Sequence, residues 1–385
     1  MRRLFLLVGS IVFVDLMFFA AITPLLPWYA DRFDLGKTGA GLLAGAYAAG
    51  TLLGALPSGW LTARLGSRRT MLIGLAMTSA ASFGFAFGHT IALLDAMRFL
   101  QGVGGACTWA AGFGWLLSLA APEDRGKTIG KAMSAALVGL LMGPALGALA
   151  REIGPELPFS AVGVLAIVLA VTALRLDAPP SGGVVSERPL RTSLGDAPVR
   201  LAMWLVAVPA LGFGAVEVLV PLALDRLGAT SIAIAGTFVA ASAIEAVAQV
   251  LVGRATDRHG RLWPMRLCLA GALAFLLVLP LPDVAWLLAG VTVVGSVVMG
   301  AVNTPAMALL SDNVEAAGVE QGFGFALVNL VWASGQVIGT VAGAGVAEAT
   351  SDTVTYLLLA SVCAATLGLL ARRPVSRPAL AGERA

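Results

Sequence analysis

The stretch TGAGLLAGAYAAGTLLGALPSGWLTA, residues 38–63, contains no charged side chain. An uncharged apolar run of about 18 residues or more indicates a membrane-spanning helix, because the hydrocarbon core of a bilayer is about 30 Å thick. Runs of this kind recur along the chain and predict an all-α membrane protein. Twelve spans are expected, at residues 4–28, 38–63, 70–94, 99–122, 132–150, 157–174, 201–224, 227–253, 267–282, 284–311, 322–347 and 353–371.

The composition excludes a soluble globular protein. Of the 385 residues, 58% are hydrophobic and 12% are charged, whereas a soluble domain carries roughly 25% charged residues. The first span contains Asp15 and is too long for a cleaved signal peptide. The three cysteines lie in apolar runs without disulfide or metal-ligand spacing, so no metal or other cofactor is expected.

Basic residues are distributed unevenly about the predicted spans. If every span crosses the membrane, the side that carries both termini collects 20 of the 25 Lys and Arg residues. The other side holds Arg32, Lys37, Arg151 and Arg226. Because positively charged loops stay in the cytoplasm, we expect both termini to be cytoplasmic in a multi-pass protein of the cell membrane. The basic residues are dispersed over six short segments, which does not indicate a nucleic-acid partner.

The sequence divides into two similar halves. Residues 175–200 form a long connection rich in Pro, Gly, Ser and charge, which predicts a cytoplasmic linker. Residues 1–174 and 201–385 are then expected to form two six-helix bundles. The halves repeat each other at an offset near 194, for example at segments 59–66 and 253–260. Parallel repeats of this kind are typical of transporters whose two bundles rock about a site near the middle of the membrane.

Three glycines at helical spacing, Gly139, Gly143 and Gly147, predict a smooth stripe on the fifth span. Residues at i, i+4 and i+8 share a helix face, and small residues let two helices approach closely in a membrane. Pro144 beside the stripe favours a bend or a sliding surface. The alternative is static packing.

The segments 59–66 and 253–260 share the spacing Gly-x4-Arg-x-Gly. This spacing predicts a tight turn with an arginine that reaches a neighbouring helix end and latches the cytoplasmic side closed. The alternative is that these arginines serve as topological anchors alone. The residues concerned are Gly59, Arg64 and Gly66 in the first half and Gly253, Asp257, Arg258 and Gly260 in the second.

Ionisable residues inside the predicted spans are the candidates for coupling and binding: Asp15, Arg98, Glu217 and Glu245. A charge at the bilayer centre costs about 2.5–3.5 kcal/mol on insertion scales, so such residues mark ion pathways. Burial favours the protonated form of a carboxyl group, and a nearby cation favours the ionised form. A buried acid can therefore hold a proton or a cation, and that competition is the physical basis of antiport. The alternative is a structural role, such as a pair between Arg98 and Asp95.

These residues resemble the drug:proton antiporter branch of the major facilitator superfamily, in particular vesicular amine transporters and bacterial multidrug efflux transporters. The resemblance covers nearly the whole chain. Its glycine–proline pattern on the fifth span is associated with antiporters in that superfamily. The matching pieces are Phe13-Val-Asp15, Pro24-Leu-Leu-Pro27, the 59–69 loop, Arg98-Phe-Leu-Gln101-Gly102, Asp124-Arg125-Gly126-Lys127, Gly139-x3-Gly143-Pro144-x2-Gly147 and Glu217-x3-Pro221.

The resemblance also implies roles for individual residues. Asp15 would pair with an amine and exchange a proton, and Glu217 would take a second acidic role. The acids of this family in spans 10 and 11 fall on Asn303 and Asn329, and its lysine in span 2 falls on Tyr47. Those replacements predict weaker selectivity for cations.

These features predict a proton-coupled antiporter that exports a small amphipathic, cationic organic compound by alternating access. Its expected partners are that compound, protons and the lipid bilayer, and the chain is expected to act as a monomer. One alternative is a facilitator or symporter of a neutral metabolite, with little sensitivity to Asp15. Another is a non-transporting membrane receptor, which would not need several buried acids. A membrane enzyme is not expected, because the sequence has no metal-ligand cluster and no His beside a buried nucleophile.

Overall fold

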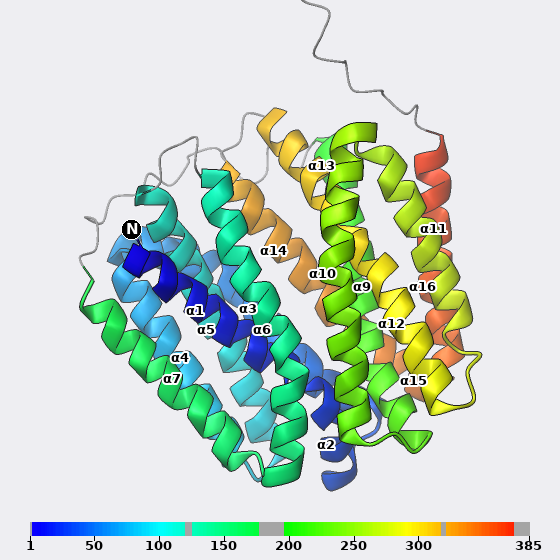
Figure 1. The fold of residues 1–385 in the computed structure, drawn as a ribbon, viewed down its shortest axis with the longest axis horizontal. Coiled ribbons are helices and arrows are strands. Elements are labelled where there is room, and N and C mark those ends of the chain that lie inside the picture. Colours follow the sequence, from blue (N-terminus) through cyan, green and yellow to red (C-terminus); the bar gives the residue numbers. More distant parts are fainter. Residues whose placement is uncertain (1, 120–124, 177–195, 317–320, 373–385) are drawn as a thin grey trace, which may run out of the picture.

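The protein is all-helical, and its helices form twelve membrane-spanning segments, as predicted (Figure 1). The structure is a computed structural model that describes residues 2–119, 125–176, 196–316 and 321–372. The first six segments are made by α1 (Arg2–Ala20), η1 (Thr23–Leu25), α2 (Leu26–Arg32), α3 (Lys37–Leu65), α4 (Ser67–Ala86), α5 (Ile91–Leu119), α6 (Arg125–Ile153) and α7 (Glu156–Leu174).

The last six segments follow the same plan with two interrupted helices. They are made by α9 (Ala197–Arg226), α10 (Ser231–His259), α11 (Leu262–Val278), α12 (Ala285–Ala301), α13 (Asn303–Ala316), α14 (Gln321–Val337), η3 (Ile338–Ala342), α15 (Gly343–Ala349) and α16 (Asp352–Ala371). The predicted linker lies mostly outside the described residues. Helix α9 includes Ala197, so span 7 begins earlier than expected.

Apolar side chains cover the outside of the protein. Nine helical segments of the described chain are long and apolar enough to cross a membrane; α11 is shorter, and α4 and α5 complete the twelve. Large side chains such as Trp286 and Val294 are 75% and 70% exposed. An apolar surface this extensive requires lipid rather than water around it, as expected of a multi-pass membrane protein.

Three predicted spans are interrupted, and proline explains two of the breaks. Helix α1 ends at Ala20, shortly before Pro24 and Pro27, which lack the backbone N–H that a helix needs. Val302 separates α12 from α13, and Pro305 cannot donate a hydrogen bond to the carbonyl of the residue four positions earlier. Each of these broken segments remains one of the predicted spans.

The eleventh segment contains a π-helix, η3, between α14 and α15. A π turn is wider than an α turn and is often found at functional sites. Its residue Thr340 is fully buried, and its hydroxyl donates to the carbonyl of Gln336 at 2.9 Å. No feature of the sequence predicted this segment.

Two large apolar clusters form the core. One draws almost all its members from α1–α7 and the other from α9–α16 (Figure 1). The N-terminus and the end of α16 lie on one side of the protein, which we call the terminal side. The side that carries the ends of α2, α9 and α15 is called the opposite side.

Candidate functional site

Asp15 lies on α1 in the interior of the protein and is 2% exposed. Its Oδ2 accepts a hydrogen bond from the Tyr47 hydroxyl at 2.9 Å and another from Trp109 Nε1 at 2.8 Å. Its Oδ1 is buried without a hydrogen-bond partner. A Cβ atom at Gly105 would lie 3.0 Å from that oxygen, so this glycine leaves space beside it. Half of the carboxyl group is thus held in place and half is left available.

Arg98 on α5 is fully buried and holds the broken end of α1. Its guanidinium donates to the carbonyls of Phe18 and Phe19, at 3.4 and 3.3 Å, and to Gln101 Oε1 at 2.8 Å. It makes no hydrogen bond or ion pair with Asp95, so the structural pair considered from the sequence does not form in the described chain. Arg98 lies two turns inside α5, which begins eight residues before the predicted start of span 4.

Glu217 lies on α9, in the other half of the protein. Gln336 Nε2, on α14, donates a hydrogen bond to Glu217 Oε2, while Glu217 Oε1 is buried without a partner. Arg98 is an electrostatic neighbour of both Asp15 and Glu217. The interior therefore places one acid from each half around a single arginine.

Aromatic side chains line the same region. The Phe19 ring lies 4.7 Å from the Tyr47 ring and 6.3 Å from the Trp332 ring, measured between centroids, so the cluster joins α1 and α3 to α14. The Arg98 guanidinium carbon lies 5.5 Å from the Tyr47 ring centroid, within cation–π range. Such a surface can receive an organic cation by its ring faces as well as by its acids.

Sequence reasoning missed Trp109 and Gln336, although both left a signal. Trp109 follows Arg98 by eleven residues, three helical turns, and therefore lies on the same face of α5. Gln336 is a polar side chain in an uncharged span. Asn329 lies seven residues before Gln336 and so on the same side of α14.

Glu245 and Asn303 form a second group, separate from the first. Glu245 on α10 accepts a hydrogen bond from Gln249 at 2.9 Å, and its side chain occupies the space beside Gly300 of α12. Asn303 follows Gly300 by three residues, and its Oδ1 is buried without a hydrogen-bond partner. Neither residue contacts the Asp15 carboxyl group. The structure therefore brings together Asp15, Tyr47, Arg98 and Glu217 but not all of the predicted residues.

The glycine stripe of α6 packs against α1, the helix that carries Asp15. A Cβ atom at Gly143 would lie 2.7 Å from the Met17 carbonyl oxygen, and one at Gly139 or Gly147 would collide with the carbonyl of Phe13 or Ala21. Pro144 lies inside α6, beside the stripe. The backbones of α1 and α6 are in direct contact from Phe13 to Ala21, the part of α1 that contains Asp15, so the stripe does not face lipid.

The predicted latch residues lie on the terminal side. Gly66 and Gly260 each end a helix with positive φ, 82° and 79°, as a tight turn requires. Arg64 stacks on the Trp60 ring of its own helix, with its guanidinium carbon 4.3 Å from the ring centroid. A Cβ atom added at Gly59 would have no neighbour within 4 Å, and one added at Gly253 would lie 3.8 Å from Thr304. Arg258 is exposed, and the Asp257 side chain lies outside the described part of the chain. Latching of this side stays a prediction.

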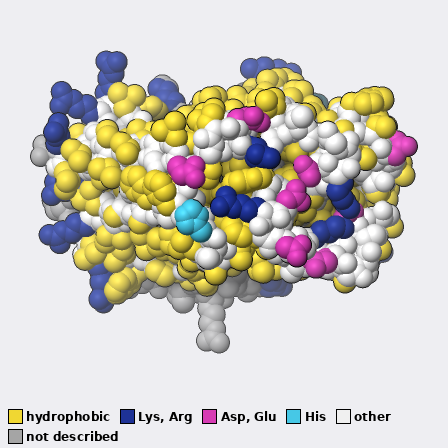
Figure 2. Space-filling view, turned by 90° about the horizontal axis from the view of Figure 1, so that it is seen from below, with side chains coloured by type: hydrophobic (Ala, Val, Ile, Leu, Met, Phe, Trp, Pro, Cys, Tyr) yellow, Lys and Arg dark blue, Asp and Glu magenta, His cyan; other side chains and the backbone are white. Residues whose placement is uncertain are grey.

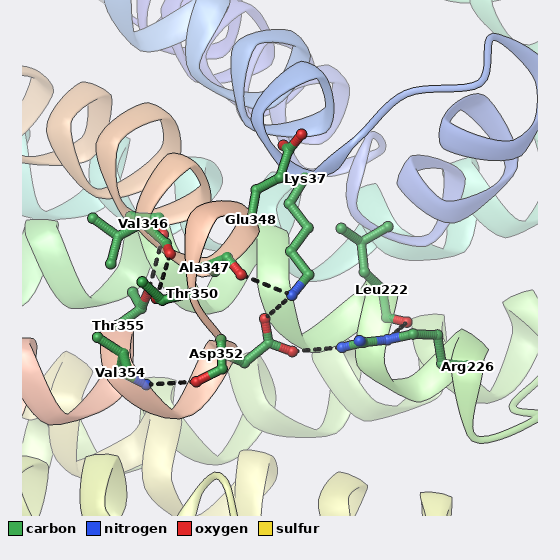
Figure 3. Close-up of polar contacts among 12 residues, drawn as sticks. Lys37, Leu222, Arg226, Val346, Ala347, Glu348, Thr350, Asp352, Val354 and Thr355 are labelled. Atoms are coloured by element: carbon green, nitrogen blue, oxygen red, sulfur yellow. Dashed lines mark hydrogen bonds and ion pairs between the residues drawn. The ribbon is translucent and has the colours of Figure 1, made fainter.

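Charged side chains close the opposite side instead. Lys37 Nζ, at the start of α3, lies 2.6 Å from Asp352 Oδ1, and Arg226, at the end of α9, binds the other Asp352 oxygen (Figure 3). The Thr38 amide donates to Glu348 Oε2 at 2.6 Å. Figure 2 shows acidic and basic side chains gathered across the middle of this face. We call these five residues the charged gate, because they join α3 of the first half to α9, α15 and α16 of the second.

Asp352→Asn should open the charged gate. Of the two ion pairs that the substitution removes, only Lys37–Asp352 joins the two halves. Since that pair is partly exposed, we assign it up to roughly 1 kcal/mol, or up to about a fivefold change in the ratio of open to closed forms. The distance across the gate would be measured by double electron–electron resonance between spin labels at positions 31 and 349, introduced after replacement of the three native cysteines. We expect a larger fraction of molecules with the long, open-gate distance in the variant than in the wild type. Asp34→Asn, an exposed acid near the gate, is the control, and equal distributions in all three proteins would contradict the assignment.

The family comparison covers most of the chain. The sequence model described as Major Facilitator Superfamily matches residues 8–319 and 203–385. Multidrug resistance protein 1 of Bacillus subtilis is 27% identical over 342 residues, which cover 86% of each chain. Quinolone resistance protein NorA of Staphylococcus aureus is 27% identical over 225 residues, 57% of each chain. The MFS-type transporter ppzB of Metarhizium rileyi is 33% identical over 187 residues, so this chain spans about two fifths of that relative.

Solved structures show the same fold at low sequence identity. A bacterial homolog of the human lysosomal transporter Spinster, in an inward-facing and occupied conformation, superimposes with a TM-score of 0.77 at 16% identity, covering 97% of this chain and 98% of that chain. The nucleoside transporter NupG gives a TM-score of 0.74 at 14% identity, covering 96% and 99%.

Proposed function

We propose, from the premise that this chain belongs to the Major Facilitator Superfamily, that it is a proton-coupled antiporter that exports a small amphipathic organic cation. One observation carries the proposal. Asp15 and Glu217, one from each half, each keep a buried carboxyl oxygen without a hydrogen-bond partner and share Arg98 as a neighbour. The relatives named for multidrug and quinolone resistance support export of organic compounds.

The chemistry of the site supports exchange. An ionised carboxylate with an unused acceptor is costly in a dry interior, so each acid is stabilised by a proton or by a cationic substrate. Arg98 adds a fixed positive charge that disfavours keeping both a proton and a cation close by. The aromatic rings of Phe19, Tyr47 and Trp332 add apolar and cation–π contact for the organic part of the substrate.

The closed gate defines the facing state under this proposal. If the terminal side is cytoplasmic, as the distribution of basic residues predicts, the charged gate seals the outside. The structure then corresponds to a state that is closed toward the outside. Exchange of one proton for one monovalent cation moves no net charge, so the pH difference alone drives it. At 1.36 kcal/mol per pH unit, a difference of about one unit sustains a gradient of about tenfold.

The test is transport by the purified protein in proteoliposomes under an imposed pH gradient. Candidate organic cations would be screened for accumulation on the acidic side, and we expect it to stop when a protonophore removes the gradient. A facilitator of a neutral metabolite would equilibrate its substrate whether or not a gradient is present. A receptor would bind compounds without moving them. Accumulation that ignores the gradient would rule out proton coupling.

Asn329→Asp should increase the preference for cations. An amide can hydrogen-bond a substrate but offers no full charge to offset the desolvation of an ammonium group. We expect the wild type to accept monovalent cations and to let neutral analogues compete, whereas the variant should favour the cation by about tenfold, the effect of one charge-assisted contact. The added acid should also move the pH optimum.

The measurement is uptake of a charged substrate and its neutral isostere into acid-loaded vesicles. Asn303→Asp is the matched control, because Asn303 begins α13, three residues after the Gly300 that Glu245 covers, and lies on a different helix from Gln336. The control should leave the ratio of the two uptake rates unchanged. Strict cation selectivity in the wild type, unaffected by Asn329→Asp, would place Asn329 outside the substrate path.

A further inference from the structure

A hollow of about 500 Å³ lies on the seam between the two halves, apart from the central site. Its walls come from α3 and α5 of the first half and from α14 and η3 of the second. This volume lies within the range of sites for small organic molecules, roughly 300–1,000 Å³. Its lining includes Leu42, Ala46, Ala49, Asp95, Val337 and Val341.

The hollow faces the surroundings of the protein near the opposite side. Leu42 is 48% exposed, and Ala96, another lining residue, is exposed on α5. Leu42 follows the start of α3 by five residues, and Asp95 follows the start of α5 by four. At 1.5 Å per residue, both lie within about 8 Å of the helix ends, at the depth where lipid headgroups meet hydrocarbon.

Asp95 is the one ionisable residue in the lining of this hollow. Its Oδ1 is buried without a hydrogen-bond partner, and Arg98, three residues later, directs its donors to Phe18, Phe19 and Gln101 instead. The remaining lining residues are apolar or glycine. The Oδ1 atom lacks compensation, because neither a protein donor nor bulk water reaches it, while the half-buried side chain leaves the carboxylate accessible to a ligand in the hollow.

We propose that this seam hollow binds an amphipathic monocation from the bilayer, with its cationic head on Asp95 and its alkyl tail against Leu42, Val337 and Val341. Charge complementarity selects the head, and the apolar wall at the level of the acyl chains selects the tail. The inference does not depend on proton coupling at Asp15. It adds a second ligand site, reached from the lipid and separate from the cluster around Asp15.

An occupant of this hollow would act on the conformational equilibrium. Since one wall belongs to α3 and α5 and the other to α14 and η3, a bound molecule contacts both halves in the arrangement seen here. Rocking of the halves would separate those walls and remove half of the contacts. Binding therefore favours the state in which the charged gate is closed, by the difference in affinity between the two states.

The test measures equilibrium binding of radiolabelled dodecyltrimethylammonium to the full chain in nanodiscs of neutral lipid. An Asp15→Asn background reduces the contribution of the central site. Adding Asp95→Asn should weaken binding about tenfold, as expected for loss of one close coulombic pair between the quaternary ammonium and the carboxylate. Dodecyldimethylamine oxide, which has the same tail and no net charge at neutral pH, should bind equally with and without Asp95.

Two further variants distinguish the hollow from a general effect of charge. Ala46→Phe fills the hollow without changing any charge and should weaken binding of both amphiphiles. Asp283→Asn, which removes an exposed acid from the loop before α12, should change neither. In the spin-label experiment across the gate, the cation should increase the fraction of molecules with the short, closed-gate distance in the wild type. It should not do so in Asp95→Asn.

Equal affinity for dodecyltrimethylammonium with and without Asp95 would overturn the proposal, and so would unchanged binding in Ala46→Phe. An effect of Asp283→Asn as large as that of Asp95→Asn would also overturn it, because the cation would then be responding to surface charge. None of these measurements uses a proton gradient. A negative result in the binding test therefore does not contradict pH-driven export, and a negative result in the export test does not contradict binding in the hollow.

Discussion

Asp15→Asn should reduce export driven by a pH gradient about a hundredfold or more, the scale expected when one partner of a buried charge interaction worth about 3 kcal/mol is lost. Asparagine keeps the shape of the side chain and can still accept hydrogen bonds from Tyr47 and Trp109, but it cannot exchange a proton. The measurement is accumulation of an organic cation in proteoliposomes with a defined pH difference. Protein yield and size-exclusion profile should match the wild type.

Tyr47→Phe is the matched control for that prediction. It removes one of the two hydrogen bonds to the Asp15 carboxyl group but leaves the titrating group and the Trp109 bond in place. We expect it to lose about tenfold in transport, the lower end of the scale for one hydrogen bond to a charged group, because the Trp109 bond remains. Normal gradient-driven export by Asp15→Asn would end the assignment of proton exchange to this residue.

Gly143→Leu should abolish transport while the protein still inserts into the membrane. The first added atom would already lie 2.7 Å from the Met17 carbonyl oxygen and 2.5 Å from Ala20 Cβ. Backbone cannot move aside as a flexible side chain can, so α6 must separate from α1, with an overpacking cost of about 1–3 kcal/mol or more. Because α1 carries Asp15, we expect the variant to be trapped in one facing state. Substrate binding and transport would be measured on the same preparation.

Gly130→Leu provides the matched control on the same helix. An added Cβ atom there would meet nothing within 4 Å, so the larger side chain should be tolerated. Transport should stay within about twofold of the wild type, as for most surface substitutions. If Gly143→Leu transported as well as Gly130→Leu, the close contact between α1 and α6 would not belong to the working cycle.

The number and type of the helices could be predicted from the sequence because a bilayer demands long uncharged runs, as at residues 38–63. Helix ends were predicted less well. The uncharged run of span 4 begins at Phe99, yet α5 begins at Ile91, before both Asp95 and Arg98. A charged residue can lie inside a membrane helix when protein surrounds it, as the carbonyls of Phe18 and Phe19 surround Arg98. Composition along one helix does not reveal that shelter.

The central site could be predicted in part. Asp15, Arg98 and Glu217 were identified because buried charge is rare, and Tyr47 by its position in the resembling pattern. Nothing along a single span distinguishes Glu217 from Glu245, because both are lone acids in apolar runs. Tertiary packing separates them: Glu217 binds Gln336 of α14 and has Arg98 of the first half as an electrostatic neighbour, whereas Glu245 lies over Gly300. Such differences depend on which helices become neighbours.

The charged gate was missed for a different reason. Lys37, Arg226 and Asp352 stand at helix ends, where charges normally serve to place a helix in the membrane. Their partners are far away in sequence, and Lys37 and Asp352 belong to opposite halves. The repeat drew attention to the loops of the terminal side, where segments 59–66 and 253–260 match. The gate has no such internal copy, so sequence symmetry could not reveal it.

The π-helix η3 widens one turn of the otherwise α-helical eleventh segment. A π turn holds one more residue than an α turn, and each residue of an α-helix advances the direction of its side chain by about 100°. If η3 tightened to α geometry, everything beyond it would rotate by about that angle relative to α14. Gln336, which binds Glu217 and precedes η3, would stay in place. Glu348, which follows η3, would turn away from Thr38. The orientation of a gate residue at the membrane surface is therefore fixed by the winding of five residues near the centre of the protein.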